Sequence, residues 1–192
     1  MSIRRIIRVA DVAPQRWRNG GGQTRELLVW PSPNDWNVRI SVADVDRDGS
    51  FSAYPEVERW FAVVEGAGVD LAIDGTSHRM VPSSPPLSFD GGAKIECHLP
   101  DGPTRDLNLM ARRGKSVMQS VAIGATWRPN ATQCGLFASV VGHCIADDHD
   151  EVAVPRESLL WFDSPPHTLS FRTRARKPTQ PIGWWLAYRE GD

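Results

Sequence analysis

The amino-acid sequence predicts an all-β protein made of two similar antiparallel barrels or sandwiches. Fifteen prolines and sixteen glycines divide the 192 residues into short apolar runs. Several of these runs alternate between apolar and polar residues, and long stretches with the 3.6-residue period of a helix are nearly absent. Many short strands separated by turns are typical of an all-β sandwich or barrel. A similarity between the two halves of the chain adds a duplication to this prediction.

The strands of the first half are expected where an alternating or apolar run is bounded by turn residues. Residues 36–42, WNVRISV, alternate strictly, so Arg39 and Ser41 lie on the face opposite to the apolar side chains. We expect the apolar face to pack against the other sheet of the same sandwich, which leaves Arg39 and Ser41 facing either solvent or a cavity. The other strands are expected at residues 24–30, 59–66, 69–75, 86–92, 93–99 and 106–112.

The second half shows the same pattern of short apolar runs. Residues 136–142, LFASVVG, match residues 60–66, WFAVVEG, at Phe, Ala, Val and Gly. Residues 183–189 share a Leu and an Arg with residues 106–112 in the same order along the chain. Strands are expected here at residues 117–123, 136–142, 151–155, 158–162, 167–174 and 182–189.

The repeat predicts two domains, one in residues 1–114 and one in residues 115–192. The alignment places Trp184 and Trp185 where the first half has Leu107 and Asn108. An indole ring in place of an amide would fill a cavity and contribute packing rather than recognition. We therefore expect the ligand pocket in the first domain, and a degenerate repeat without it in the second.

Composition and charge exclude some classes of function. A net charge of −1 gives no overall field that would attract nucleic acid or an anionic membrane. The chain starts without the apolar run of a signal peptide and has no apolar stretch long enough for a membrane span. Its three cysteines show no C-x-x-C spacing, which favours reduced, buried thiols in a cytoplasmic protein.

Three consecutive glycines, Gly20, Gly21 and Gly22, stand out in the stretch RWRNGGGQTREL. A phosphate-binding loop would separate its glycines, add a lysine or lead into a helix, and this stretch leads into a strand instead. The glycines could let the backbone approach a ligand and offer it N–H groups, or they could simply form a tight corner that closes a barrel. Both interpretations remain open at this point.

No motif for metal binding or nucleophilic catalysis is present. The five histidines include no H-x-H pair on a strand, and the run DDHDE at residues 147–151 is typical of a polar loop between strands. A nucleophile elbow and a catalytic cysteine signature are both missing. We expect no metal and no cofactor. Five polar residues on expected strands could face either solvent or a pocket: Arg39, Ser41, Arg59, Asp106 and Asn108.

Three segments together resemble the HutD/Ves family of bicupin proteins, which are often associated with histidine-utilisation operons. They are WRNGGGQTREL at residues 17–27, WNVRISVADVDRDGSFSAYPEVERW at residues 36–60, and FDGG followed by DGPTRDLNLMARR in residues 89–113. The resemblance implies two fused cupin barrels in the cytoplasm, with a pocket for a small carboxylate-bearing molecule and no metal triad. It implies these ligand-binding residues: Trp17, Asn19, Gly20, Gly21, Gly22, Thr24, Arg39, Ser41, Arg59, Asp106 and Asn108.

For family members in the histidine pathway, the resemblance implies formiminoglutamate or a relative as the ligand and a regulatory role. We expect Arg39 to be the main clamp for the ligand carboxylate, because a planar guanidinium forms two parallel hydrogen bonds with a carboxylate. Asp106 is expected to pair with Arg39 in the empty protein. No nucleic-acid or membrane partner is expected, and the protein could form a homodimer.

Two alternatives to ligand binding without turnover stay open. The first is a cupin isomerase or hydrolase that acts on a small organic acid, with Asp106 or Glu26 as general base beside Arg39. The second is a purely structural interaction partner, in which the pocket would be empty and Arg39 dispensable. Turnover of formiminoglutamate would separate the enzyme from the binding protein.

Overall fold

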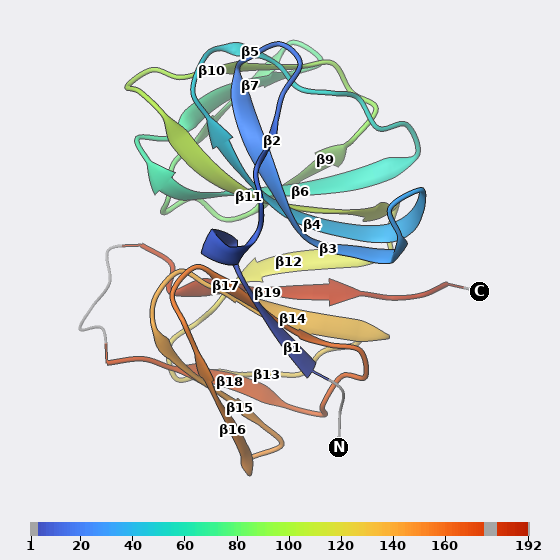
Figure 1. Cartoon of the computed structure of the whole chain (residues 1–192), viewed down its shortest axis with the longest axis vertical. Helices are drawn as coiled ribbons and strands as arrows, with labels where there is room; N and C mark the ends of the chain where they lie inside the picture. The colour runs from blue at the N-terminus through green and yellow to red at the C-terminus, as the bar shows by residue number, and fades with distance from the viewer. Residues whose placement is uncertain (1–3, 175–179, 192) are drawn as a thin grey trace. The chain divides into compact units, whose positions relative to one another are not determined.

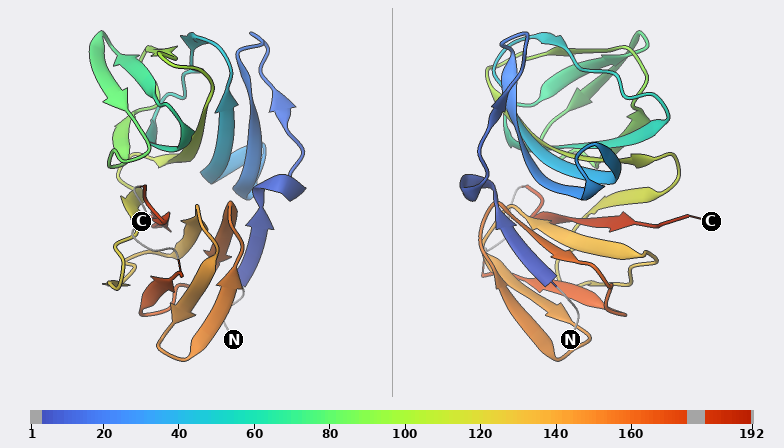
Figure 2. Two further views of the ribbon diagram at one scale, coloured as in Figure 1. Left: turned by 90° about the vertical axis from the view of Figure 1, so that its left-hand side faces the viewer. Right: turned by 45° about the vertical axis from the view of Figure 1, so that its right-hand side comes forward.

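The computed structural model describes residues 4–174 and 180–191, and almost every element in them is a β-strand (Figure 1). The one helical element in this part of the chain is a short 3-10 turn, Val9–Asp11, which Figures 1 and 2 show between β1 and β2. All strand pairs are antiparallel. The prediction of an all-β antiparallel protein is confirmed. None of the helices described is long and apolar enough to span a membrane.

The chain divides into two compact units, residues 13–114 and residues 1–12 together with 115–192. The first unit has a six-stranded and a four-stranded sheet. In sheet order, the six-stranded sheet contains β2 (Gln15–Arg16), β3 (Gly22–Ser32), β4 (Asp35–Val45), β11 (Thr104–Arg112), β6 (Val57–Gly66) and β9 (Leu87–Asp90). The four-stranded sheet contains β5 (Gly49–Ser50), β10 (Ile95–His98), β7 (Val69–Ile73) and β8 (Thr76–Met80).

The second unit also has two antiparallel sheets. Its five-stranded sheet contains β1 (Arg4–Arg8), β17 (Ser158–Phe162), β14 (Gln133–Ala138), β19 (Gly183–Tyr188) and β12 (Ser116–Ser120). Its four-stranded sheet contains β13 (Thr126–Trp127), β18 (Leu169–Arg172), β15 (Gly142–Ala146) and β16 (Asp150–Val154). Strand β1 pairs with β17, so the start of the chain lies in the sheet formed by its second half.

The single strand expected at residues 136–142 is divided in the structure. Strand β14 ends at Ala138 and β15 begins at Gly142. Directly after β14, the N–H of Ser139 donates to the carbonyl of Ile182, and its hydroxyl donates to the carbonyl of Pro181 at 2.6 Å. These bonds fix a connection between the two sheets where periodicity alone suggested a continuous strand.

The core of the first unit lies between its two sheets. Val45, Phe61 and Val63 from the six-stranded sheet pack with Leu71 and Ile95 from the four-stranded sheet. Alternation along β4 places Arg39 and Ser41 on the same face as Val45. The expectation that the apolar face of residues 36–42 packs against the opposite sheet of its own domain is therefore wrong, because the face that carries Arg39 is the one turned toward that sheet.

The core of the second unit is filled by aromatic and aliphatic side chains. Trp185 is 2% exposed and stacks on Trp127, with ring centroids 5.0 Å apart and planes inclined by 16°. Trp185 pairs with Leu136 in β14, and Asn108 pairs with Phe61 in β6. Leu136 and Trp185 both belong to the core of the second unit. In the first unit, Phe61 belongs to the core and Asn108 lines the cavity. The Trp185 indole therefore packs in the core of the second unit. The repeat itself, and the equivalence of Trp185 and Asn108 that it implies, stay predictions.

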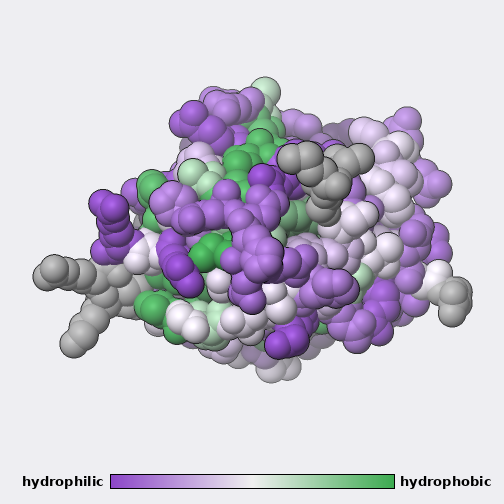
Figure 3. Space-filling model, turned by 90° about the horizontal axis from the view of Figure 1, so that it is seen from below, coloured by the Kyte–Doolittle hydropathy of each residue, from purple (hydrophilic) through white to green (hydrophobic). Residues whose placement is uncertain are grey.

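Few large hydrophobic side chains of the described residues are exposed to solvent. The molecular face drawn in Figure 3 is mostly hydrophilic, with smaller hydrophobic areas between the polar ones. Large hydrophobic side chains are exposed at four of the described positions: Ile6, Val117, Ile123 and Val141. Scattered exposed side chains of this kind are ordinary in soluble proteins.

Candidate functional site

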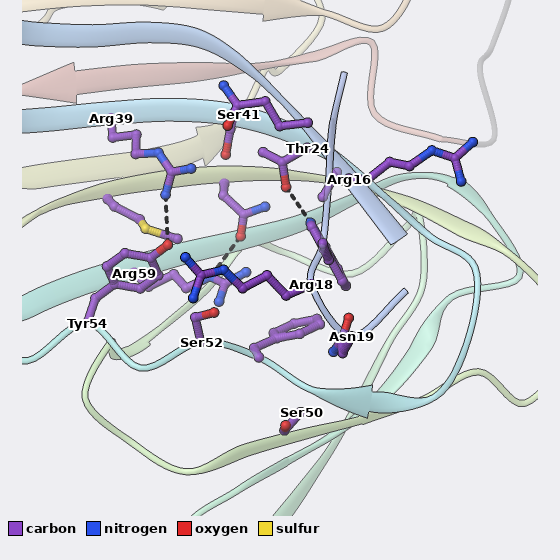
Figure 4. Close-up of a pocket in the computed structure, with 16 residues that line it drawn as sticks. Arg16, Arg18, Asn19, Thr24, Arg39, Ser41, Ser50, Ser52, Tyr54 and Arg59 are labelled. Carbon is purple, nitrogen blue, oxygen red and sulfur yellow. Dashed lines mark hydrogen bonds between the residues drawn. The ribbon is translucent and has the colours of Figure 1, made fainter. Parts of the chain in front are cut away.

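A cavity of about 500 Å³ lies within the first unit, against the face of the six-stranded sheet that carries Arg39 (Figure 4). Strands β3, β4, β6 and β11 supply one wall. The segments at residues 15–19 and 50–54 supply the rest. The lining residues are Gln15, Arg16, Trp17, Arg18, Asn19, Thr24, Arg39, Ser41, Ala43, Ser50, Phe51, Ser52, Tyr54, Arg59, Asn108 and Met110.

Strand register brings the polar wall residues together. Met110 on β11 lies opposite Arg39 on β4 and also opposite Arg59 on β6, so the two arginines flank one methionine in a row across the sheet. Two residues along, Asn108 lies opposite Ser41. Side chains two apart on a strand share a face, so the alternation seen in the sequence places all of them on the cavity side. Seven of the eleven predicted ligand-binding residues line the cavity: Trp17, Asn19, Thr24, Arg39, Ser41, Arg59 and Asn108.

Arg39 is held by two partners at the cavity wall. Its Nε donates to Oε1 of Glu26 at 2.6 Å, and its Nη1 donates to the hydroxyl of Tyr54 at 3.0 Å, the bond dashed in Figure 4. Its Cζ lies 5.7 Å from the centre of the Tyr54 ring. A guanidinium has five N–H donors, so these bonds leave donors that an anionic ligand could use.

The expected pairing of Asp106 with Arg39 is wrong, because Glu26 is the partner of Arg39. Asp106 lies opposite Ala43 and Val63, four residues along β11 from Met110, which lies opposite Arg39. It is fully buried, and it is absent from the residues that line the cavity. Asp106 thus lies on the same sheet face as Asn108, buried beyond the residues that line the cavity.

Asn108 connects the buried carboxylate to Arg59. Its Nδ2 donates to Oδ1 of Asp106, and its Oδ1 accepts a hydrogen bond from Nε of Arg59 at 2.8 Å. The Arg59 guanidinium also lies over Phe51, with Cζ 4.7 Å from the ring centre. A cation over an aromatic face is favourable, most of all when both are desolvated. Arg59 is therefore fixed from two sides while it faces the cavity.

Burial shifts the pKa values of Asp106 and Arg59, the two charged groups that Asn108 connects. Desolvation raises the pKa of Asp106 to about 7, although Arg59 and the hydrogen bond from Asn108 act in the opposite direction. Desolvation lowers the pKa of Arg59, and the negative charge of Asp106 partly compensates. Removing a carboxylate from water favours its neutral form, and a nearby cation favours the charged form.

The three glycines form a corner. The backbone N–H of Gly21 donates to Oδ1 of Asn19 at 3.0 Å, and its carbonyl accepts from the N–H groups of Asp46 and Arg47. At Gly22 a Cβ would collide with the carbonyl oxygen of Asp44, so only glycine fits. Gly20 has a φ of 70°, a conformation that favours glycine.

None of the three glycines lines the cavity, whereas the residues around them do. Trp17 packs edge-on against Phe51, and its Nε1 donates to the hydroxyl of Thr24 at 2.8 Å. The structural interpretation therefore applies to the glycines, and the functional interpretation applies to the residues around them. The glycines turn the chain, and the turn holds Trp17 and Asn19 at the cavity.

Sequence reasoning missed several cavity residues, among them Arg16, Arg18, Phe51 and Tyr54. Arg16 and Arg18 precede the glycines and are exposed at the cavity rim. Phe51 and Tyr54 lie in a loop without strand periodicity, so no pattern could show where they point. The segment SFSAYPEVE was the available signal, since it belongs to the family resemblance.

The His, Cys, Asp and Glu side chains in the described part of the chain are the candidates for metal ligands and reactive thiols. This part of the chain contains no group of three or more His, Cys, Asp or Glu side chains that could hold a metal ion. The absence of a metal stays a prediction. The three cysteines are buried and free, and burial raises the pKa of Cys97 and of Cys144 to about 12. Neutral buried thiols are poor nucleophiles.

The fold and the site together define an all-β, cupin-like protein with a cationic cavity. A cupin 2 conserved barrel domain protein from Leptotrichia buccalis has the same fold, with a TM-score of 0.58 and 11% identity over 97% of this chain and 96% of that chain. This chain belongs to the HutD family, whose model matches residues 9–178. The family resemblance seen in the sequence is confirmed.

Individual relatives agree with this assignment. Protein Ves of Citrobacter koseri is 35% identical over 156 residues, which cover 80% of each protein. An uncharacterized 21.2 kDa protein in the hutC 3′ region of Pseudomonas putida is 28% identical over 158 residues, again 80% of each. HutD from Pseudomonas fluorescens SBW25 has the same fold, with a TM-score of 0.81 and 23% identity over 98% of this chain and 100% of that chain.

Proposed function

We propose that this protein binds a small carboxylate or amino-acid derivative, of which formiminoglutamate is the type, and acts as a regulatory or accessory protein in histidine catabolism. The observation that carries the proposal is the charge of the cavity. Four arginines line it, and none of the described lining residues is an Asp or Glu. Arginine suits the bidentate recognition of carboxylates. The relative in the hutC 3′ region supports the link to histidine utilisation. Two fused cupin barrels in the cytoplasm complete the proposal.

The alternative of a cupin isomerase or hydrolase requires a general base within reach of a ligand in the cavity. Asp106 does not line the cavity, and Glu26 is held by Arg39 and by a 3.2 Å hydrogen bond from Gln15. These contacts favour binding over turnover. A purely structural role would give no reason for a cavity lined by arginines.

Calorimetry and thermal unfolding with formiminoglutamate, glutamate and histidine test the proposal. At a concentration of 100 times its Kd, a specific ligand should add about 2.7 kcal/mol to the free energy of unfolding. We expect formiminoglutamate to stabilise the protein and to be recovered unchanged after prolonged incubation. Conversion of the compound would support the enzyme, and the absence of binding by all three compounds would overturn the proposal.

Replacing Arg39 with lysine is expected to weaken binding of formiminoglutamate about tenfold or more while the fold stays intact. A lysine cannot reproduce two parallel hydrogen bonds to a carboxylate, and losing a partner from a desolvated charge pair costs about 2–5 kcal/mol, at about 1.4 kcal/mol per decade of affinity. Arg79→Lys is the matched control, because Arg79 is an exposed arginine on β8 that pairs with Asp70 at 3.2 Å. Calorimetric affinities equal to wild type for both Arg39→Lys and Arg39→Ala would place the binding site elsewhere.

A further inference from the structure

A chain of three buried polar side chains leads from the core of the first unit to its cavity. Asp106, Asn108 and Arg59 are 0%, 2% and 6% exposed, respectively. The carboxylate accepts a hydrogen bond from the amide, and the amide oxygen accepts one from the guanidinium. Of these three residues, Asn108 and Arg59 line the cavity and Asp106 does not. A ligand in the cavity would therefore interact with Asp106 through Asn108 and Arg59. The chain therefore gives a buried carboxylate an electrostatic connection to whatever occupies the cavity.

One oxygen of this carboxylate has no hydrogen-bond partner. Oδ2 of Asp106 is fully buried and unsatisfied, whereas Oδ1 is bonded to Asn108. Leaving an ionised oxygen in this state costs free energy, and a proton on it would remove the negative charge. Oδ2 is therefore the atom at which a proton would be added.

Few charged or titratable groups face Asp106 from the neighbouring strands. Arg59 on β6 favours its ionised form, and Asp44 on β4 disfavours it. On β10, the Cys97 thiol feels the charge of Asp106, but burial keeps this thiol neutral. Arg59 is thus the cation that compensates Asp106. Any anionic group that binds to Arg59 will therefore change the pKa of Asp106.

We infer that Asp106 takes up a proton when an anionic ligand binds at Arg59, so that binding in the cavity is coupled to proton uptake. This inference rests on the proposed function. A ligand carboxylate at Arg59 would share the guanidinium with Asp106, and two carboxylates around one cation disfavour double ionisation. The proton moves from the buffer to Oδ2, and its charge offsets the negative charge that the ligand brings.

The direction of the pH dependence follows from linkage. Burial already raises the pKa of Asp106 to about 7 in the free protein, and a bound anion raises the pKa further. Because the complex holds more protons than the free protein between these two pKa values, affinity falls as the pH rises through that window. The loss approaches tenfold per pH unit, since one proton is taken up for each ligand bound.

Calorimetry in two buffers measures the proton directly. Formiminoglutamate is titrated into the protein at about pH 8, in HEPES and in Tris, which differ in their heat of ionisation. The heats should differ between the two buffers by an amount that corresponds to net proton uptake. Asp106→Asn keeps an oxygen that can accept from Asn108 but cannot titrate, and it should bind with equal heats in both buffers. Asp44→Asn, which removes a part-buried carboxylate on the neighbouring strand, should retain the uptake.

The outcomes separate the inference from the function on which it rests. Binding of formiminoglutamate with equal heats in both buffers and a flat pH profile would overturn the inference and leave the proposed function standing. Proton uptake that persists in Asp106→Asn would also overturn it, because another group would then be responsible. Absence of binding at every pH would overturn the proposed function itself. The wild-type comparison between buffers does not depend on the folding of any variant.

Discussion

Replacing Trp185 with alanine is expected to lower the free energy of unfolding by about 3–5 kcal/mol, the usual cost of removing a large aromatic side chain from a core. The Trp185 side chain belongs to the core of the second unit and stacks on Trp127. Its removal leaves a cavity and exposes the Trp127 face that it covered. Denaturant unfolding monitored by circular dichroism measures the loss.

A matched control is Ile123→Ala, because Ile123 is 66% exposed and its truncation should change stability by less than about 0.5 kcal/mol. The folded fraction of Trp185→Ala should still bind formiminoglutamate with wild-type affinity, because the arginine-lined cavity belongs to residues 13–114. A Trp185→Ala protein as stable as wild type but unable to bind would show that the second unit carries the recognition site.

Replacing Arg59 with alanine is expected to abolish ligand binding and to cost about 3–5 kcal/mol of stability, because one partner of a buried charged pair is removed. Asp106 would then remain buried without the cation that compensates it. Without that cation the pKa of Asp106 rises further, so the folded state holds the proton more tightly than the unfolded chain does. The destabilisation should therefore be larger at about pH 8 than at about pH 5, where Asp106 is protonated.

Unfolding free energies at the two pH values, measured for Arg59→Ala and for the double variant Arg59→Met with Asp106→Asn, test this explanation. The double variant removes both charges and should recover most of the stability at the higher pH, because replacing a whole buried pair is far less costly than breaking it. Equal losses for the single and double variants at both pH values would mean that the Arg59 side chain matters only through its packing on Phe51 and Phe89.

Much of the fold was predictable because its strands carry strong patterns. The strict alternation of residues 36–42 lies inside β4, and the runs at residues 69–75 and 158–162 correspond to β7 and β17. Strands β1 and β8 were missed, because RRIIR and TSHRM are mostly exposed and polar, and their strand conformation comes from pairing with β17 and β7. Pairing with a distant partner leaves little trace in local composition.

The candidate site was predictable to the extent that it lies on strands. Alternation and the family resemblance together selected Arg39, Ser41 and Asn108, and all three line the cavity. The partner of Arg39 could not be found in the same way, because a β-bulge between Glu26 and Leu28 shifts the register of β3 against β4. Tyr54 was missed because it lies in a loop, where neighbouring residues have no fixed direction.

The pairing of β1 with β17 sets an order in which the molecule can be completed during synthesis. The first unit, residues 13–114, is continuous, so every strand that it needs has been made once Gly114 has left the ribosome. The second unit begins earlier in the chain but finishes later, since β1 at Arg4–Arg8 has to wait for β17 at Ser158–Phe162. Contacts between segments so far apart in sequence form slowly, because a long loop must close first. During synthesis, the unit that carries the cavity can therefore fold while β1 is still unpaired.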